Sequence, residues 1–149
     1  MRVLVERVAS ASVTSEGTPA GRIGAGLLVY LGAAAGDTPI DAEILADKVR
    51  HLRIFGDAAG RMNLDVLQAG GAVLAISAFT LLADAQKGRR PSFDGAARPE
   101  LAEPLYDRFC ARLRELGVRV ETGRFRTMMQ VESVNDGPIT ILIEQGNGA

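Results

Sequence analysis

The sequence Gly71-Ala-Val-Leu-Ala-Ile-Ser-Ala-Phe-Thr-Leu-Leu82 is an almost unbroken apolar run, and the polar, basic segment 83–91 follows it. An apolar run of this length, with glycines before it and a polar loop after it, is typical of a buried central strand. We therefore predict a strand here, at the centre of the fold. Two hydroxyl residues, Ser77 and Thr80, lie near its end. Because buried hydroxyls need hydrogen-bond partners, they either bond to neighbouring backbone or mark a site at the end of the strand.

Segments on both sides of this run predict further strands and two long helices. Apolar residues recur at helical spacing in 39–52 and 98–116. Alternating or apolar segments predict strands and hairpins at 3–8, 12–24, 26–32, 118–122, 128–134 and 140–144, with a tight turn at 135–138. Because short turns join most of these strands, we expect an α+β domain with mainly antiparallel sheets, not a doubly wound sheet.

Composition limits the classes of function. Cys110 and His51 are the only residues of their types, so an internal disulfide is impossible and a zinc site is nearly excluded. We expect no metal and no other cofactor. A serine or cysteine triad would need His51 as its base, and we expect His51 at the surface near the end of the first helix.

Length and charge limit the expected number of domains, the partners and the location of the protein. A chain of 149 residues is expected to form one domain, 1–149. Its formal net charge of −1 gives no reason to expect general capture of nucleic acid, although a local basic patch can still serve. No segment has the pattern of a signal peptide or of a transmembrane helix, so we expect a cytoplasmic protein without a membrane partner.

Two features outside the apolar run suggest special backbone contacts. Arg7 shares a strand face with Val3 and Val5, so either its charged head reaches water or it ties down backbone carbonyls. Gly137-Pro138 lies in the predicted tight turn. Such a bond is usually trans, but proline makes the cis form accessible. A cis pair would aim two adjacent carbonyls in nearly the same direction, as a rigid acceptor pair beside a pocket.

Four blocks occur in one order along the chain: Ser77-x-Phe79-Thr80-Leu81, the basic segment 87–93, Met129-Gln130-Val131 and the segment 135–140. Together they resemble the D-aminoacyl-tRNA deacylase family, and the resemblance covers essentially the whole chain. It implies a homodimer in which mainly antiparallel sheets form a barrel-like core with two long helices packed outside.

The resemblance also implies an activity. Members of this family hydrolyse the ester between a D-amino acid, or glycine on a non-cognate tRNA, and the terminal adenosine of tRNA, which is chiral proofreading in translation. Gly137-Pro138 is then cis and reaches the partner's active site, where its carbonyls contact the substrate's amino group and reject L-amino acids. Arg7 matches the arginine that orients this pair.

The remaining candidate site residues follow from the same resemblance and from the basic loop. The catalytic group is Ser77, Phe79 and Thr80; the pocket is lined by Ala78, Ala102, Phe125 and Met129; and tRNA phosphates are contacted by Lys87, Arg89 and Arg90. A covalent role for Thr80 requires a base to activate it, and none is evident. We therefore expect Thr80 to position the substrate, backbone N–H groups around Phe79 and Thr80 to stabilise the oxyanion, and the ribose 2′-hydroxyl to help activate water.

Two positions depart from the family pattern. Ala78 stands where the family usually has Gln, and Arg126-Thr127-Met128 stands where small and acidic residues are usual. The first departure leaves open a non-catalytic RNA-binding dimer on the same scaffold. The second changes the pocket rim or the tRNA contact. A general small-ester hydrolase is a third class, which the lack of an evident triad disfavours.

Overall fold

The apolar run lies in the centre of the main sheet, as predicted. In the computed structural model, which describes residues 1–146, β6 (Ala72–Ser77) lies between β3 (Gly26–Gly32) and β7 (Val120–Thr122). The prediction that the strand continues to Leu82 is wrong, because Phe79–Leu82 form a 3₁₀ helix, η1. The chain therefore leaves the sheet directly after Ser77.

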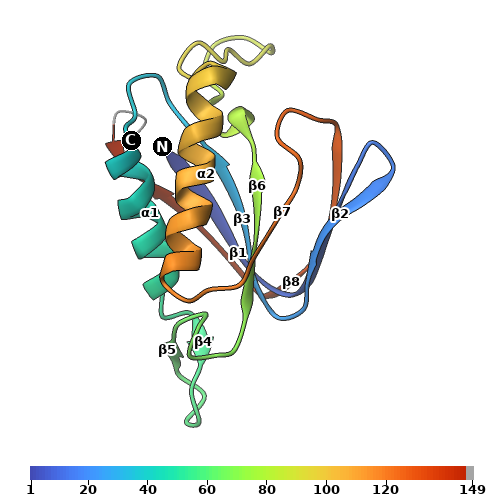
Figure 1. Cartoon of the computed structure of the whole chain (residues 1–149), viewed down its shortest axis with the longest axis vertical. Coiled ribbons are helices and arrows are strands. Elements are labelled where there is room, and N and C mark those ends of the chain that lie inside the picture. Colours follow the sequence, from blue (N-terminus) through green and yellow to red (C-terminus); the bar gives the residue numbers. More distant parts are fainter. Residues whose placement is uncertain (147–149) are drawn as a thin grey trace.

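The main sheet is mixed and curls into a nearly closed barrel (Figure 1). β1 (Arg2–Ser15) pairs antiparallel with β2 (Thr18–Ile23), with β3 and with β8 (Met129–Glu144). The pairs β3–β6 and β6–β7 are parallel, because a connection that contains a helix carries the chain back across the sheet each time. The predicted α+β class with a barrel-like sheet and two outer helices is confirmed, and the two parallel pairs are the departure from antiparallel pairing.

Both predicted helices are present, as α1 (Pro39–His51) and α2 (Pro99–Glu115). Figure 1 shows them side by side over one face of the sheet. α1 begins with a capping box, in which the Thr38 N–H donates to Asp41 Oδ2 at 2.9 Å. No helix in the described part of the chain is long and apolar enough to span a membrane.

Side-chain alternation along the central strands produces two cores. Val29 of β3 and Val73 of β6 face the helices and share a buried cluster with Phe109. Leu28 and Leu74 are the chain neighbours of these valines and therefore lie on the opposite face of the sheet, where they share a second cluster inside the barrel. The small antiparallel ribbon of β4 (Phe55–Gly56) and β5 (Met62–Leu64) projects from the end of the molecule opposite the two termini (Figure 1).

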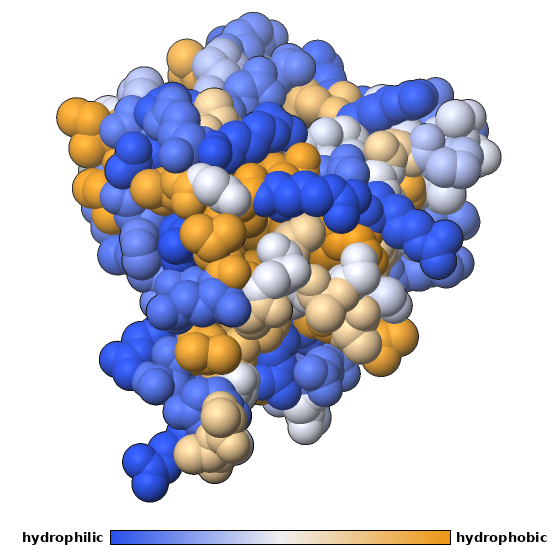
Figure 2. All heavy atoms as spheres, turned by 60° about the horizontal axis from the view of Figure 1, so that its bottom comes forward, coloured by the Kyte–Doolittle hydropathy of each residue, from blue (hydrophilic) through white to orange (hydrophobic). Residues whose placement is uncertain are grey.

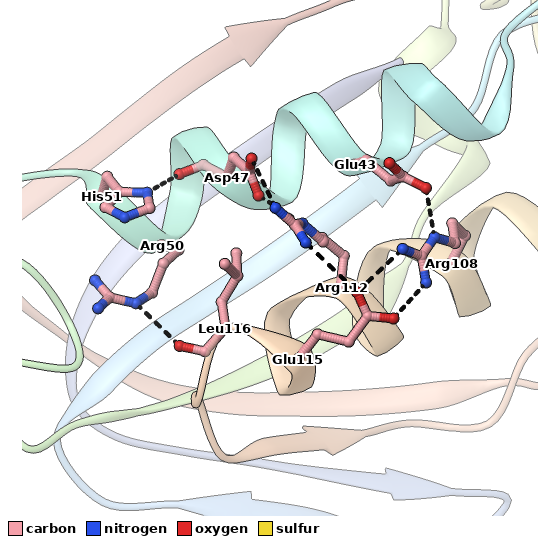
Figure 3. Close-up of polar contacts among 8 residues, drawn as sticks. All are labelled: Glu43, Asp47, Arg50, His51, Arg108, Arg112, Glu115 and Leu116. Atoms are coloured by element: carbon pink, nitrogen blue, oxygen red, sulfur yellow. Dashed lines mark hydrogen bonds and ion pairs between the residues drawn. The ribbon is translucent and has the colours of Figure 1, made fainter.

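Arginines of α2 bind acids of α1 where the helices meet (Figure 3). Arg108 Nε lies 2.8 Å from Glu43 Oε1, and Arg112 Nε lies 2.8 Å from Asp47 Oδ1. Arg108 also donates to Glu115 on its own helix. The hydrogen bonds from Arg112 hold the pKa of Asp47 below its usual value, and those from Arg108 do the same for the pKa of Glu115.

Acid is expected to weaken this helix pair. A carboxylate whose pKa is lowered on folding stabilises the fold above its unfolded pKa and loses that contribution as the pH falls through its folded pKa. The urea midpoint should therefore fall between about pH 6 and about pH 3, and Asp47→Asn should remove part of the fall. The contribution of the Asp47–Arg112 pair to the free energy of unfolding is expected to be below about 1 kcal/mol, because the Asp47 side chain is 44% exposed and water screens the pair.

The matched control is Glu103→Gln. Glu103 is exposed on α2, and it has no ion pair within residues 1–146. This variant should keep the full wild-type dependence of the urea midpoint on pH. If Asp47→Asn keeps it too, the ion pair does not couple the helices.

Candidate active site

A cavity of about 810 Å³, cavity A, opens at the carboxyl ends of β3 and β6. Its volume lies within the range of small-molecule sites. It brings together all seven residues predicted to be catalytic or to line the pocket beside them. These are Ser77, Ala78, Phe79, Thr80, Ala102, Phe125 and Met129.

Helix η1 forms one edge of cavity A. The Ala78 N–H donates to the Leu31 carbonyl at 2.8 Å, and the Ala78 carbonyl accepts from Leu81 N–H at 3.1 Å. A 3₁₀ helix leaves the N–H groups of its first residues without an intrahelical acceptor, here those of Phe79 and Thr80. The Phe79 ring and the Thr80 hydroxyl are exposed, so the hydroxyl is not the buried group expected from the strand prediction.

Gly32 permits this position of η1, and sequence analysis missed it. A Cβ at Gly32 would lie 2.4 Å from Leu82 Cδ2 and 2.9 Å from the Ala78 carbonyl oxygen. Any larger residue would therefore push η1 away from the end of β3. Only the folded arrangement reveals this close approach, because a glycine at a strand end is unremarkable in sequence.

Aromatic contacts support two walls of cavity A. The rings of Phe79 and Phe93 meet edge to face with centroids 5.1 Å apart. Phe125 packs against Tyr106 with centroids 6.2 Å apart, and the Tyr106 hydroxyl donates to the Ala75 carbonyl at 2.7 Å. Burial raises the pKa of Tyr106, so its hydroxyl stays protonated and holds the wall to β6. Tyr106 is a further supporting residue that sequence analysis missed.

The segment 124–128, which we call the rim loop, closes the side of cavity A next to β8. Thr127 Oγ1 lies 2.6 Å from the buried Ser15 hydroxyl and donates to the Arg124 carbonyl at 2.9 Å. The Glu16 N–H donates to the Met128 carbonyl at 3.0 Å. These bonds fasten the rim loop to the end of β1.

The chemistry of cavity A is poor in side-chain bases. None of its described lining residues is His, Cys, Asp or Glu. His51 is exposed at the end of α1, as expected, where its Nδ1 lies 2.8 Å from the Asp47 carbonyl (Figure 3). Cys110 is buried in α2, and burial raises the pKa of its thiol to about 11. A His-based or Cys-based triad is therefore not assembled at this site.

Residues 84–92 form a basic loop beside the cavity. Backbone bonds of 2.8 Å in each direction join Asp84 and Ser92 at its base, directly before Phe93. Lys87, Arg89 and Arg90 are exposed on it, and none of them lines cavity A. Within residues 1–146, no group of three or more His, Cys, Asp and Glu side chains is arranged to hold a metal ion.

The remaining predicted residues line a second cavity, cavity B, of about 550 Å³. Arg7, Gly137 and Pro138 lie there beside residues of β4 and β5. The Gly137-Pro138 peptide bond is cis. On a single chain, cavities A and B share none of their described lining residues, so the structure does not bring Gly137-Pro138 to Thr80.

The predicted tight turn at 135–138 is instead a bulge within β8. Glu6 pairs with Thr140 and Val8 pairs with Asn135, so residues 136–139, the β8 bulge, stand opposite Arg7 alone. The prediction of a tight turn is wrong, because the segments before and after the bulge both pair with β1 in the same direction and the chain does not reverse there.

Arg7 anchors the β8 bulge. Its Nη1 donates to the Ile54 carbonyl at 2.8 Å, and its Nε donates to the Asp136 carbonyl at 3.2 Å. The Asp136 carboxylate lies 3.3 Å from the same nitrogen. Of the two alternatives for Arg7, the one in which it ties down backbone carbonyls is confirmed.

Comparisons with known proteins show which family the chain resembles. The sequence model of the D-Tyr-tRNA(Tyr) deacylase family matches residues 4–144. The chain is 58% identical to a D-aminoacyl-tRNA deacylase of Anaeromyxobacter dehalogenans and 57% identical to one of Symbiobacterium thermophilum, over 97% of this chain and 97% and 95% of those proteins.

Two solved structures have the same fold. One is described as the c-Myc DNA Unwinding Element Binding Protein, with a TM-score of 0.90 and 37% identity, over 97% of this chain and 98% of that one. The other is described as a probable eukaryotic D-amino acid tRNA deacylase, with a TM-score of 0.82 over 95% of this chain and 97% of that one. At 18% identity, the second likeness shows the fold only.

Proposed function

Because the chain belongs to the D-Tyr-tRNA(Tyr) deacylase family, and is thus a hydrolase of the aminoacyl-tRNA ester bond, we propose that it is a chiral proofreading enzyme of the cytoplasm. Its substrates are D-aminoacyl-tRNA and glycine on a non-cognate tRNA, and its products are the free amino acid and tRNA. The observation that carries this proposal is cavity A, which gathers the seven expected site residues around a helix start with free N–H groups.

Catalysis in this proposal depends on backbone and on the substrate. The N–H groups of Phe79 and Thr80 stabilise the negative charge that develops on the ester carbonyl oxygen when water attacks. Thr80 positions the ester and does not attack it, since no described lining residue of cavity A is a base that would activate its hydroxyl. The ribose 2′-hydroxyl of the terminal adenosine assists the attacking water.

Discrimination between D- and L-amino acids is assigned to the β8 bulge of a second copy of the chain. Gly137 and Pro138 are exposed, and they line a different cavity from Thr80. A homodimer that inserts the bulge into the partner's cavity A would bring the two halves together. There the bulge carbonyls would bind the substrate's amino group and exclude an L side chain.

The surface around the β8 bulge supports such a dimer. Val134 and Leu142, on β8 before and after the bulge, are each 56% exposed. Figure 2 shows apolar surface among charged side chains on the end of the molecule that carries β4 and β5. Exposed apolar surface of this kind marks protein contacts. The basic loop, with Lys87, Arg89 and Arg90, is left free to bind the phosphates of the tRNA acceptor stem.

Ala78 does not argue against catalysis. Both polar groups of its backbone are used, one to join η1 to β3 and the other to close η1. A residue at this position therefore serves the fold through its backbone. The alternative, a non-catalytic RNA-binding dimer, keeps the same scaffold and predicts binding without turnover.

Incubation with D-tyrosyl-tRNA and L-tyrosyl-tRNA separates these functions. We expect release of D-tyrosine at a rate at least about 10²-fold above that of L-tyrosine, which is the order of discrimination that the shape of a pocket can supply. Retention of both esters on a bound tRNA would support the RNA-binding dimer. Equal turnover of both esters, or of simple esters without adenosine, would contradict chiral proofreading.

A further inference from the structure

Arg126 places an unused positive charge on the rim of cavity A. Of the described residues that line this cavity, Arg126 alone carries a formal charge. It is exposed, and its side chain makes no hydrogen bond or ion pair with any residue in 1–146. The guanidinium is therefore available to a ligand that enters the cavity.

The backbone of Arg126 is held in place by its neighbours. Its φ of +59° lies in the left-handed region, which residues other than glycine rarely adopt. The two residues that follow Arg126 in sequence are both fixed to the end of β1. Thr127 contacts the Ser15 hydroxyl, and the Met128 carbonyl accepts a hydrogen bond from the Glu16 N–H. The fold thus imposes this backbone position and presents the Arg126 side chain from a fixed base.

The other lining residues of cavity A suit an uncharged group. Phe79, Phe93 and Phe125 offer rings for stacking, and Ser77 and Thr80 add hydroxyls. A nucleoside with an esterified ribose fits this chemistry, but it carries no negative charge that would pair with Arg126. On aminoacyl-tRNA, the anion closest to the terminal nucleoside is the phosphodiester on its 5′ side, and it is present whatever amino acid is attached.

We propose that Arg126 binds the phosphodiester on the 5′ side of the terminal adenosine, and so makes the rim loop a substrate-binding element. This inference rests on the proposed function. A guanidinium matches phosphate oxygens with two parallel N–H donors. Lys87, Arg89 and Arg90 do not line cavity A, so they are placed for phosphates further along the acceptor strand.

The test compares two small substrates, D-tyrosyl esters of adenosine and of adenosine 5′-monophosphate. For the wild type, we expect the 5′-phosphate to lower KM about tenfold, which one charge-assisted hydrogen bond supplies, with kcat unchanged. Arg126→Gln should abolish this advantage without altering KM for the phosphate-free ester, and Arg126→Lys should retain part of it. Arg124→Gln removes an exposed charge two residues away that does not line the cavity, and should keep the full advantage.

Each other outcome overturns the inference in a recognisable way. If Arg126→Gln keeps the phosphate advantage, or the wild type has none, Arg126 does not bind the phosphate, while the deacylase function stands. If Arg126→Gln instead raises KM for a D-aspartyl but not a D-asparaginyl ester, the cation binds a side-chain carboxylate. If the wild type hydrolyses neither small ester nor D-tyrosyl-tRNA, the proposed function fails together with the inference.

Discussion

Phe79→Pro is expected to lower kcat for D-tyrosyl-tRNA by about 10²–10³-fold relative to Phe79→Ala, which is the usual cost of one oxyanion-hole donor. Phe79 is the first residue of η1, and its N–H has no intrahelical acceptor. Proline is tolerated at the first position of a helix, and the preceding residue, Ala78, has φ −144° and ψ 85°, which lies outside the α region that a following proline disfavours. The substitution therefore removes the N–H with little disturbance of η1.

Phe79→Ala is the matched control, because it removes the ring and its contact with Phe93 but keeps the N–H. Thr80→Ala is the second control, and we expect it to retain kcat within about threefold, since the hydroxyl positions the ester and the N–H remains. Single-turnover rates of hydrolysis would measure all three variants. A large loss of activity in Thr80→Ala would instead indicate that the Thr80 hydroxyl is the nucleophile. Equal rates for Phe79→Pro and Phe79→Ala would show that the Phe79 N–H does not take part in catalysis.

Arg7→Ala is expected to reduce D-tyrosyl-tRNA hydrolysis by about 10²-fold, the typical cost of misplacing a substrate-positioning group by about 1 Å. Arg7 joins the β8 bulge at Asp136 to the chain before β4 at Ile54. Without the guanidinium, these carbonyls lose their donor and the bulge loses its fixed orientation. Discrimination against L-tyrosyl-tRNA should decline in the same variant.

The control for Arg7→Ala is Arg22→Ala, which removes an exposed arginine from β2 outside both cavities. It should leave the rate and the discrimination unchanged. Circular dichroism and the urea midpoint of each variant would show that the fold persists. Wild-type rates in folded Arg7→Ala would contradict the role assigned to the β8 bulge.

Most elements could be predicted from sequence because their signals are local. The apolar stripes of α1 and α2, and the apolar runs of β3 and β6, depend on residues a few positions apart. Two predictions failed where distant contacts override the local pattern. Residues 79–82 are apolar enough for a strand, but they have left the sheet to form η1. Residues 135–138 have the composition of a turn, but both flanking segments pair with β1.

The candidate site shows the same limit. Seven residues of cavity A were predicted through the resemblance, whereas Tyr106 and Gly32 act through partners far away in the chain and carry no local signal. The role of Arg7 was left open by its strand position. The structure settles this role, because Arg7 donates to the carbonyls of Ile54 and Asp136, which are far from it in the sequence.

The central claim is that one active site is built from cavity A of one copy and the β8 bulge of another. Mixing Arg7→Ala with Phe79→Pro under subunit exchange tests it, because each variant is inactive through a different half of the site. Random exchange makes half of the dimers mixed, each with one intact site, so about a quarter of the wild-type activity should return. Activity that stays at the sum of the two separate variants would contradict a site shared between copies.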